Sequence, residues 1–127
     1  MTNLYKLVVV PLLGMGILVA GCAQQPKLLY SWESYPRIQY DTLLRAGSSP
    51  AAQIRDMQAH AEKARASNSA LPPGFRAHLG MLQLSTGNAG EARMLWLAEK
   101  STFPESTPYM DQLLKRLDAP TNGASTK

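Results

Sequence analysis

The sequence predicts an all-α domain of about five helices, and three observations indicate this fold class. β-branched residues are sparse between residues 28 and 118, and no alternation with the period of a strand is sustained there. Apolar residues instead recur at steps of three and four, which is the spacing of one helix face. Two pairs, Ser49-Pro50 and Thr107-Pro108, match a hydroxyl cap followed by proline at the first helical position.

Two helices are expected in the first half of the domain. Residues 35–45 have Pro36 in the first turn, and Gly47 follows as a residue that ends helices because it tolerates positive φ. The apolar positions of this helix are Ile38, Leu43 and Leu44. A second helix is expected from Pro50 to about Ala66. The residues on its apolar stripe are Ile54, Met57, Ala61 and Ala64.

Three more helices are expected after a polar link at residues 67–72. The third runs from about Pro73 to Ser85, and Gly87-Asn88 separates it from a fourth at about 89–102. The fifth has Thr107 as its expected cap and Pro108 as its first residue, and it reaches about residue 117. The apolar positions of these three helices are Phe75, Leu79 and Leu82, then Ala92, Leu95, Trp96 and Ala98, then Tyr109, Met110, Leu113, Leu114 and Leu117.

The third and fourth expected helices resemble one tetratricopeptide repeat, a helical hairpin of about 34 residues. The positions with the matching spacing are Gly80, Gly87, Ala92, Trp96 and Pro104. In this interpretation the small Gly80 and Ala92 let the two helices approach, and Trp96 fills the space where the next helix docks. The sequence departs from the repeat at Gln83 and Glu99, which replace an aromatic residue and an alanine. One repeat cannot bury its faces alone, so the flanking helices must cover it. A plain helical bundle with chance matches is the alternative.

Residues 1–21 have the pattern of a secretory signal peptide. Lys6 is followed by an uncharged run from Leu7 to Ala20, shorter than the roughly 20 apolar residues of a membrane span. The residues Val19, Ala20, Gly21 and Cys22 resemble the bacterial lipobox. This resemblance implies cleavage after Gly21, a diacylglycerol thioether on Cys22 and acylation of the new amine. An ordinary thiol at the end of a membrane helix is the alternative.

The mature chain is expected to be a lipidated tether at 22–27, a helical domain at 28–118 and a disordered tail at 119–127. Cys22 is the only cysteine, so a disulfide or a CxxC site within the chain is excluded. No cofactor is expected besides the lipid on Cys22. In enterobacterial lipoproteins an aspartate after the cysteine favours the inner membrane. Ala23 therefore indicates the outer membrane, on its periplasmic face.

The polar residues indicate no enzyme and no metal site. The formal charge is +4, with lysines and arginines scattered, which indicates no nucleic-acid partner. His60 and His78 form no metal-binding spacing, and structural roles are expected for both. Cap and dipole roles are expected for the carboxylates, which are Glu99, Glu105 and Asp111. A small hydrolase or ligand carrier stays open as a rival function.

Four aromatic residues follow the tether, at positions 30, 32, 35 and 40. They can fold back as a lid on the helices, or they can form a partner-binding or membrane-interface patch. Four charged residues are further candidates for polar contacts. The candidate partner-binding residues are Tyr30, Trp32, Glu33, Tyr35, Arg37, Arg76 and Arg93.

Three segments resemble a family of small proteobacterial lipoproteins of unknown function. They are Tyr30-Ser-Trp32-Glu-Ser-Tyr35, Leu71-Pro-Pro-Gly74-Phe-Arg-Ala-His-Leu-Gly80, and Glu99-Lys-Ser-Thr-Phe103-Pro-Glu-Ser106 with Tyr109-Met-Asp111. Members tend to be encoded beside a lipoprotein similar to the curli secretion channel and beside another small lipoprotein. The resemblance implies a role in an outer-membrane assembly or secretion system. Because repeat helices offer grooves for partner segments, we expect an adaptor or assembly factor whose partner is another envelope lipoprotein. An envelope structural protein that binds peptidoglycan or stabilises the membrane is the alternative.

Overall fold

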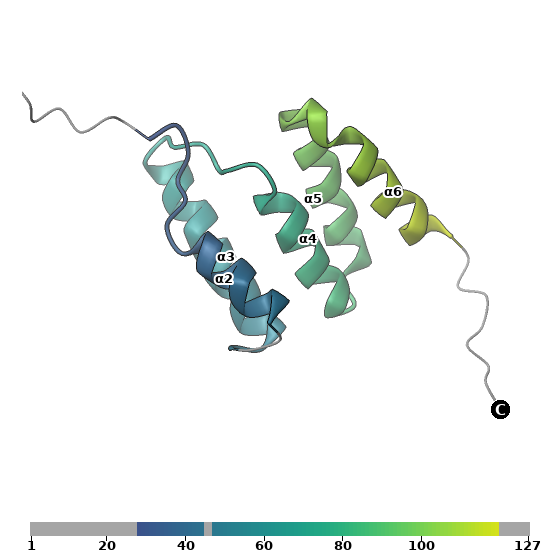
Figure 1. Ribbon diagram of the computed structural model, residues 1–127, viewed down its shortest axis with the longest axis horizontal. Helices are drawn as coiled ribbons and strands as arrows, with labels where there is room; N and C mark the ends of the chain where they lie inside the picture. The colour runs from purple at the N-terminus through teal and green to yellow at the C-terminus, as the bar shows by residue number, and fades with distance from the viewer. Residues whose placement is uncertain (1–27, 45–46, 120–127) are drawn as a thin grey trace, which may run out of the picture.

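The computed structural model describes residues 28–44 and 47–119 (Figure 1). These residues form five α-helices and one short 3-10 helix, which confirms the predicted all-α fold class. The elements are α2 (Tyr35–Leu43), α3 (Pro50–Ala66), α4 (Phe75–Ser85), α5 (Ala89–Thr102), η2 (Pro104–Ser106) and α6 (Thr107–Asp118). The predicted signal peptide, the lipobox, Cys22 and the tether all lie outside the described residues, as does the tail from residue 120.

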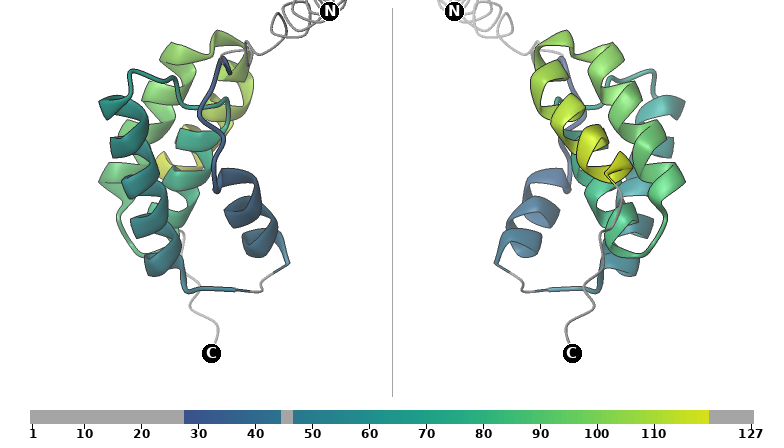
Figure 2. Two further views of the ribbon diagram at one scale, coloured as in Figure 1. Left: turned by 90° about the vertical axis from the view of Figure 1, so that its left-hand side faces the viewer. Right: turned by 90° about the vertical axis from the view of Figure 1, so that its right-hand side faces the viewer.

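The helices alternate in direction and form two layers. Within the described part of the chain, α4 packs most extensively on α5, and α5 also contacts α6 while α3 contacts α4. The two side views in Figure 2 show α3 and α5 in one layer and α2, α4 and α6 in the other. Successive helical hairpins thus place their first helices side by side, as in repeat folds.

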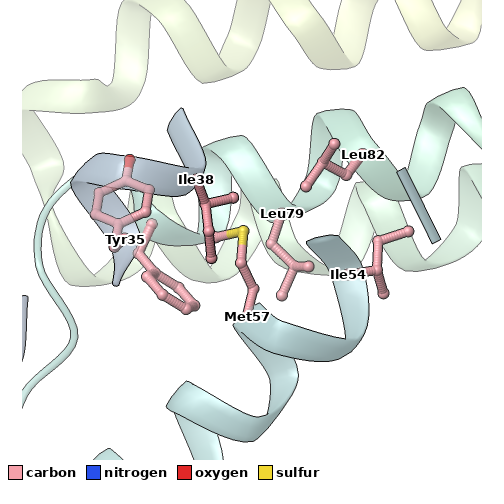
Figure 3. Close-up of a cluster of buried hydrophobic side chains, with 7 residues drawn as sticks. Tyr35, Ile38, Ile54, Met57, Leu79 and Leu82 are labelled. Carbon is pink, nitrogen blue, oxygen red and sulfur yellow. The ribbon is translucent and has the colours of Figure 1, made fainter. Parts of the chain in front are cut away.

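One core cluster joins α2, α3 and α4 (Figure 3). Tyr35 and Ile38 reach from α2 into the space between α3 and α4, where Met57 and Phe75 are fully buried. The remaining buried members are Ile54, Leu79 and Leu82. Only these two side chains of α2 belong to the cluster, and Thr42 near the end of the helix adds side-chain contacts with Gln53 and His78.

A second core cluster lies on the other side of α4, against α5 and α6. Its buried members are Ala77, Ala92, Trp96 and Met110. Three leucines of α6 pack against it and are half-buried, at positions 113, 114 and 117. The two clusters together make α4 the central helix of the domain.

Four apolar positions differ from the prediction. Leu43 and Leu44 are 76% and 57% exposed, and α2 ends at Leu43 instead of residue 45. The side chains of α2 that contact the other helices are Tyr35, Ile38 and Thr42, which share one helix face, and Leu43 and Leu44 lie off that face. Ala98 is also exposed, because it lies on the face of α5 opposite Ala92 and Trp96. Tyr109 on α6 is half-exposed, at 50%.

The helix ends agree with the sequence signals at some positions and differ at others. Ser49 caps α3 as predicted, since its Oγ accepts a hydrogen bond from the N–H of Ala52 at 3.3 Å. Asn88 occupies the N-cap position of α5 but makes no side-chain cap. Its amide donates instead to Oε1 of Gln83 at 2.9 Å. Gln83 is 5% exposed, so this bond satisfies a buried polar group where the repeat usually has an aromatic residue.

Gly80 and Trp96 meet where α4 crosses α5. Trp96 is 1% exposed, and its Nε1 donates a hydrogen bond to the carbonyl oxygen of Ala77 at 3.1 Å. A methyl group on Gly80 would lie 2.8 Å from Cδ1 of Trp96, which is closer than side chains pack. Ala92 is fully buried beside them. The glycine therefore permits the close helix–helix contact and the indole hydrogen bond together.

The other two repeat positions mark the ends of the hairpin. Gly87 has φ of 88° in the link between α4 and α5, a conformation that glycine adopts without strain. Pro104 is the first residue of η2, directly after α5 and Phe103. These two positions terminate helices, whereas the other three pack against one another.

We predict that Gly80→Ala destabilises the domain, because the added methyl overlaps the indole of a buried tryptophan. The expected loss is about 1–3 kcal/mol of unfolding free energy, measured by urea denaturation followed by circular dichroism. Gly90→Ala is the matched control, since a Cβ there meets nothing within 4 Å. That control should gain up to about 1 kcal/mol from helix propensity. Equal stability of the two variants would contradict the packing role of Gly80.

Candidate functional site

A pocket of about 250 Å³ opens on the layer formed by α2, α4 and α6. We call it the inner groove, and define it by Gln39 of α2, His78 and Met81 of α4, Glu105 of η2 and Tyr109 of α6. Met81 and Tyr109 are 48% and 50% exposed. The groove thus combines two accessible apolar side chains with polar groups from three further positions.

Glu99 lies at the base of the inner groove, although it belongs to α5. It is 1% exposed, and its two carboxylate oxygens accept hydrogen bonds from the N–H groups of Gly74 at 2.5 Å and Arg76 at 3.2 Å. These donors are at the N-terminus of α4, where N–H groups lack helical partners and the helix dipole favours negative charge. Gly74 is the N-cap residue and offers no side chain for this purpose. A carboxylate from the neighbouring helix therefore caps α4.

Gly74 adopts a left-handed conformation with φ of 85°. This turn starts α4 at Phe75 instead of Pro73, and it directs the Gly74 N–H to Glu99. A side chain here would also meet Tyr35, because a Cβ would lie 3.1 Å from the Tyr35 hydroxyl oxygen. Glycine at this position therefore serves both the backbone conformation and the packing of α2.

Tyr35 connects the base of the groove to the first core cluster. Its ring centroid is 5.2 Å from that of Phe75 and 6.1 Å from that of His78. Burial, together with the nearby charge of Glu99, raises the pKa of Tyr35 to about 12. The phenol therefore stays protonated at neutral pH. Tyr35 is 3% exposed and belongs to the core, so its side chain is not available for the partner contact considered from the sequence.

His78 forms one wall of the groove and links α4 to α2. Its Nε2 lies 3.3 Å from Oγ1 of Thr42, which itself hydrogen-bonds to the carbonyl oxygen of Ile38 at 2.9 Å and to the side chain of Gln53. Burial lowers the pKa of His78 below its ordinary value of 6.5. The imidazole is therefore neutral at pH 7. The hydroxyl next to it is engaged in contacts that join α2, α3 and α4.

His60 lies outside the inner groove and contacts the segment that precedes α2. It is 4% exposed, and its Nε2 lies 2.9 Å from the carbonyl oxygen of Ser31. The N–H of Ser31 donates to the carbonyl oxygen of Ala70 at 2.8 Å, within an isolated bridge between Tyr30 and Ala70. These bonds hold residues 28–34, which we call the lid, against α3 and the α3–α4 connection.

The aromatic candidates divide into packed and exposed side chains. Tyr30 is half-buried and lies edge-on to Phe103, with centroids 6.1 Å apart. Trp32 stacks on Tyr35 at 6.3 Å but is 42% exposed. Tyr40 is 58% exposed near the end of α2. The aromatic segment thus packs on the helices through Tyr30 and Tyr35, while Trp32 keeps an open face.

The charged candidates are dispersed over the surface. Glu33 pairs with Lys63 at 3.0 Å, and Arg37 pairs with Asp41 on the same helix at 3.0 Å. Arg93 of α5 pairs with Asp118 of α6. Arg76 lies 3.4 Å from the hydroxyl of Thr102. Glu33 and Arg37 line one pocket between α2 and α3, whereas Arg76 and Arg93 lie elsewhere, and none of the four lines the inner groove.

Sequence reasoning missed the groove residues Gln39, Met81 and Tyr109 as a set. Gln39 and Met81 come from the first helices of two hairpins, α2 and α4, and Tyr109 comes from the closing helix α6. The signal that could have found them is the repeat itself, because first helices of stacked hairpins share one layer. For His78 the sequence predicts only a structural role, without a place in a groove.

Two further properties bear on the chemistry of the site. Among residues 28–44 and 47–119, no three His, Cys, Asp or Glu side chains are grouped so that they could hold a metal ion. None of the helices described is both long enough and apolar enough to span a membrane.

We predict that Glu99→Gln destabilises the domain by about 1–3 kcal/mol, because an amide offers one acceptor where the carboxylate offers two. Urea denaturation measures the loss. Amide hydrogen exchange at Gly74 and Arg76 should accelerate more than exchange at Ala92. Glu105→Gln is the matched control, since Glu105 is exposed and its effect should stay within about 0.5 kcal/mol. Unchanged exchange at the two capped amides would contradict the capping role.

We also predict a stability loss at acid pH that depends on His78. Because its pKa is lower in the folded chain, the unfolded chain binds more protons just below pH 6.5. The stability contributed by the neutral imidazole is complete above pH 6.5 and is lost as the pH falls toward the folded pKa. The melting temperature should therefore drop between about pH 7.5 and about pH 5, and drop less in His78→Gln. Identical drops in both proteins would refute this assignment.

Comparisons with known proteins identify a family. A family model described as a domain of unknown function (DUF4810) matches residues 29–113, which run from the lid to the middle of α6 and make up two-thirds of the 127-residue chain. No curated protein and no solved structure matches the chain. Since the match covers more than half of the sequence, this protein belongs to the DUF4810 family.

Proposed function

We propose that this protein is an outer-membrane lipoprotein that acts as a periplasmic adaptor or assembly factor of an envelope secretion or assembly system. The observation that carries the proposal is the inner groove. It opens on the layer of α2, α4 and α6, where repeat proteins present their binding surface. The proposal includes no enzymatic activity, because His78 and Glu99 of the groove are engaged in contacts that join the helices.

The composition of the groove suits a segment of a partner protein. Met81 and Tyr109 present apolar surface side by side, with the Tyr109 hydroxyl 4.0 Å from the Met81 sulfur. Methionine adapts its shape to a bound side chain, and tyrosine is enriched at protein interfaces. Gln39 and Glu105 add hydrogen-bonding groups at the border. A partner helix or extended segment can therefore bury apolar side chains there and keep polar bonds at the edge.

The lipobox at residues 19–22 supports the membrane attachment. A diacylglycerol on Cys22 contributes roughly 0.8 kcal/mol for each buried CH₂, and two chains already anchor a protein stably. Ala23 after the cysteine favours the outer membrane by the enterobacterial sorting rule. The resemblance to lipoproteins encoded beside a curli-channel-like lipoprotein supports an envelope lipoprotein as the partner.

We predict that the partner is lost when the groove is changed. Tagged full-length protein is purified from detergent-solubilised membranes, and co-purifying proteins are identified by mass spectrometry. The double variant Met81→Ser/Tyr109→Ser should recover the channel-like lipoprotein at least about tenfold less, which corresponds to about 1.4 kcal/mol. Met94→Ser is the control, because Met94 is 64% exposed on α5 and does not line the groove.

Other outcomes of the same preparation would oppose the proposal. Sedimentation of the protein with peptidoglycan, without any co-purifying lipoprotein, would favour the envelope structural role. A hydrolytic turnover that His78→Ala abolishes would favour an enzyme. Radioactive palmitate that fails to label the wild type, or still labels Cys22→Ser, would remove the anchor from the proposal.

A further inference from the structure

Three apolar side chains of the lid point to solvent. Leu28 and Leu29 are 75% and 78% exposed, and Trp32 is 42% exposed. We call these three residues the apolar edge. Figure 1 shows the lid starting at one end of the domain and running beside α3 to the start of α2. Three large apolar side chains exposed within five consecutive residues are a candidate interaction site.

The backbone of the lid is held in place while these side chains face outward. Ser31 is fixed on both sides, by the carbonyl oxygen of Ala70 and by the imidazole of His60. Tyr30 and Trp32 are fixed by ring contacts with Phe103 and Tyr35. Leu28, Leu29 and Trp32 are therefore exposed on a segment whose other groups contact the rest of the domain.

The length of the chain before the lid indicates what covers the apolar edge. Leu28 follows Cys22 by six positions. A fully extended chain spans at most about 3.6 Å per residue, so Leu28 lies within roughly 22 Å of the cysteine backbone. We infer that the apolar edge inserts into the lipid interface next to the anchor and fixes the domain on the bilayer. This inference rests on the lipidation of Cys22 in the proposed function.

The chemistry of the edge favours lipid over a protein partner. Tryptophan is enriched at the membrane–water interface, and the two leucines supply apolar surface for the acyl boundary. Two ion pairs lie in this part of the surface, Glu33 with Lys63 at 3.0 Å and Glu62 with Arg65 at 2.5 Å.

Tryptophan fluorescence tests this inference on the lipidated full-length protein. The chain has two tryptophans, and Trp96 is 1% exposed in the second core cluster. The protein is reconstituted into phosphatidylcholine vesicles whose acyl chains carry bromine near the headgroup. Bromine quenches only an indole that it contacts, so the wild type should lose the emission of Trp32 and keep that of Trp96. Trp32→Phe should lose the quenching altogether.

Two more variants keep the test decisive. Leu28→Ser/Leu29→Ser retains Trp32 as the reporter and should lose most of the quenching, which covers the case that Trp32→Phe misfolds. Met94→Ser removes an exposed apolar residue elsewhere on the domain and should leave the quenching unchanged.

Wild-type emission that bromine leaves unchanged would overturn the inference, as would equal quenching in the wild type and Trp32→Phe. Loss of the co-purifying lipoprotein in Trp32→Phe, without any lipid quenching in the wild type, would instead assign the edge to a protein partner and overturn it as well. These outcomes leave the groove proposal standing. Failure of palmitate labelling at Cys22 is read separately, and it removes the anchor on which both proposals depend.

Discussion

The bond between the Glu99 carboxylate and the N-terminus of α4 organises the rest of the domain. A buried carboxylate is costly unless its oxygens are bonded, and here two backbone N–H groups bond them. The segment before α4, Pro72-Pro73-Gly74, contains no side chain that can cap a helix. The helix start and the buried charge therefore satisfy each other, and this fixes the end of α5 against the start of α4.

The same face of α5 carries the second close contact with α4. Trp96 precedes Glu99 by one turn, and it packs on Gly80 while its indole bonds to the carbonyl oxygen of Ala77. The contact between Gly80 and Trp96 sets the distance between the two helices. The bonds of Glu99 set the position of α5 along the axis of α4. With α4 fixed in this way, its two sides can bury separate clusters, one with α2 and α3 and the other with α5 and α6.

The sequence predicted the features that depend on local chemistry. Ser49-Pro50 and the glycine at 87 locate the ends of α3 and α4 because capping and positive φ act within a few residues. The exposure of Leu43 and Leu44 could not be predicted, since it depends on which face of α2 the other helices cover. The partner of Glu99 and the inner groove join residues that are distant in the chain. Their spacing in the sequence carries no signal unless the stacking of the hairpins is already known.

Tyr35 ties the lid and the inner groove into one packed unit. Trp32 of the lid stacks on one side of it, and His78 of the groove lies 6.1 Å away on another. Tyr35 also packs against Phe75 in the core and close to Gly74 at the N-cap of α4. A shift of its ring would therefore disturb both the core packing and the cap of α4. A lid held at the membrane would therefore hold the groove at a set position above it. An adaptor of this kind would present its binding surface from a tightly packed domain.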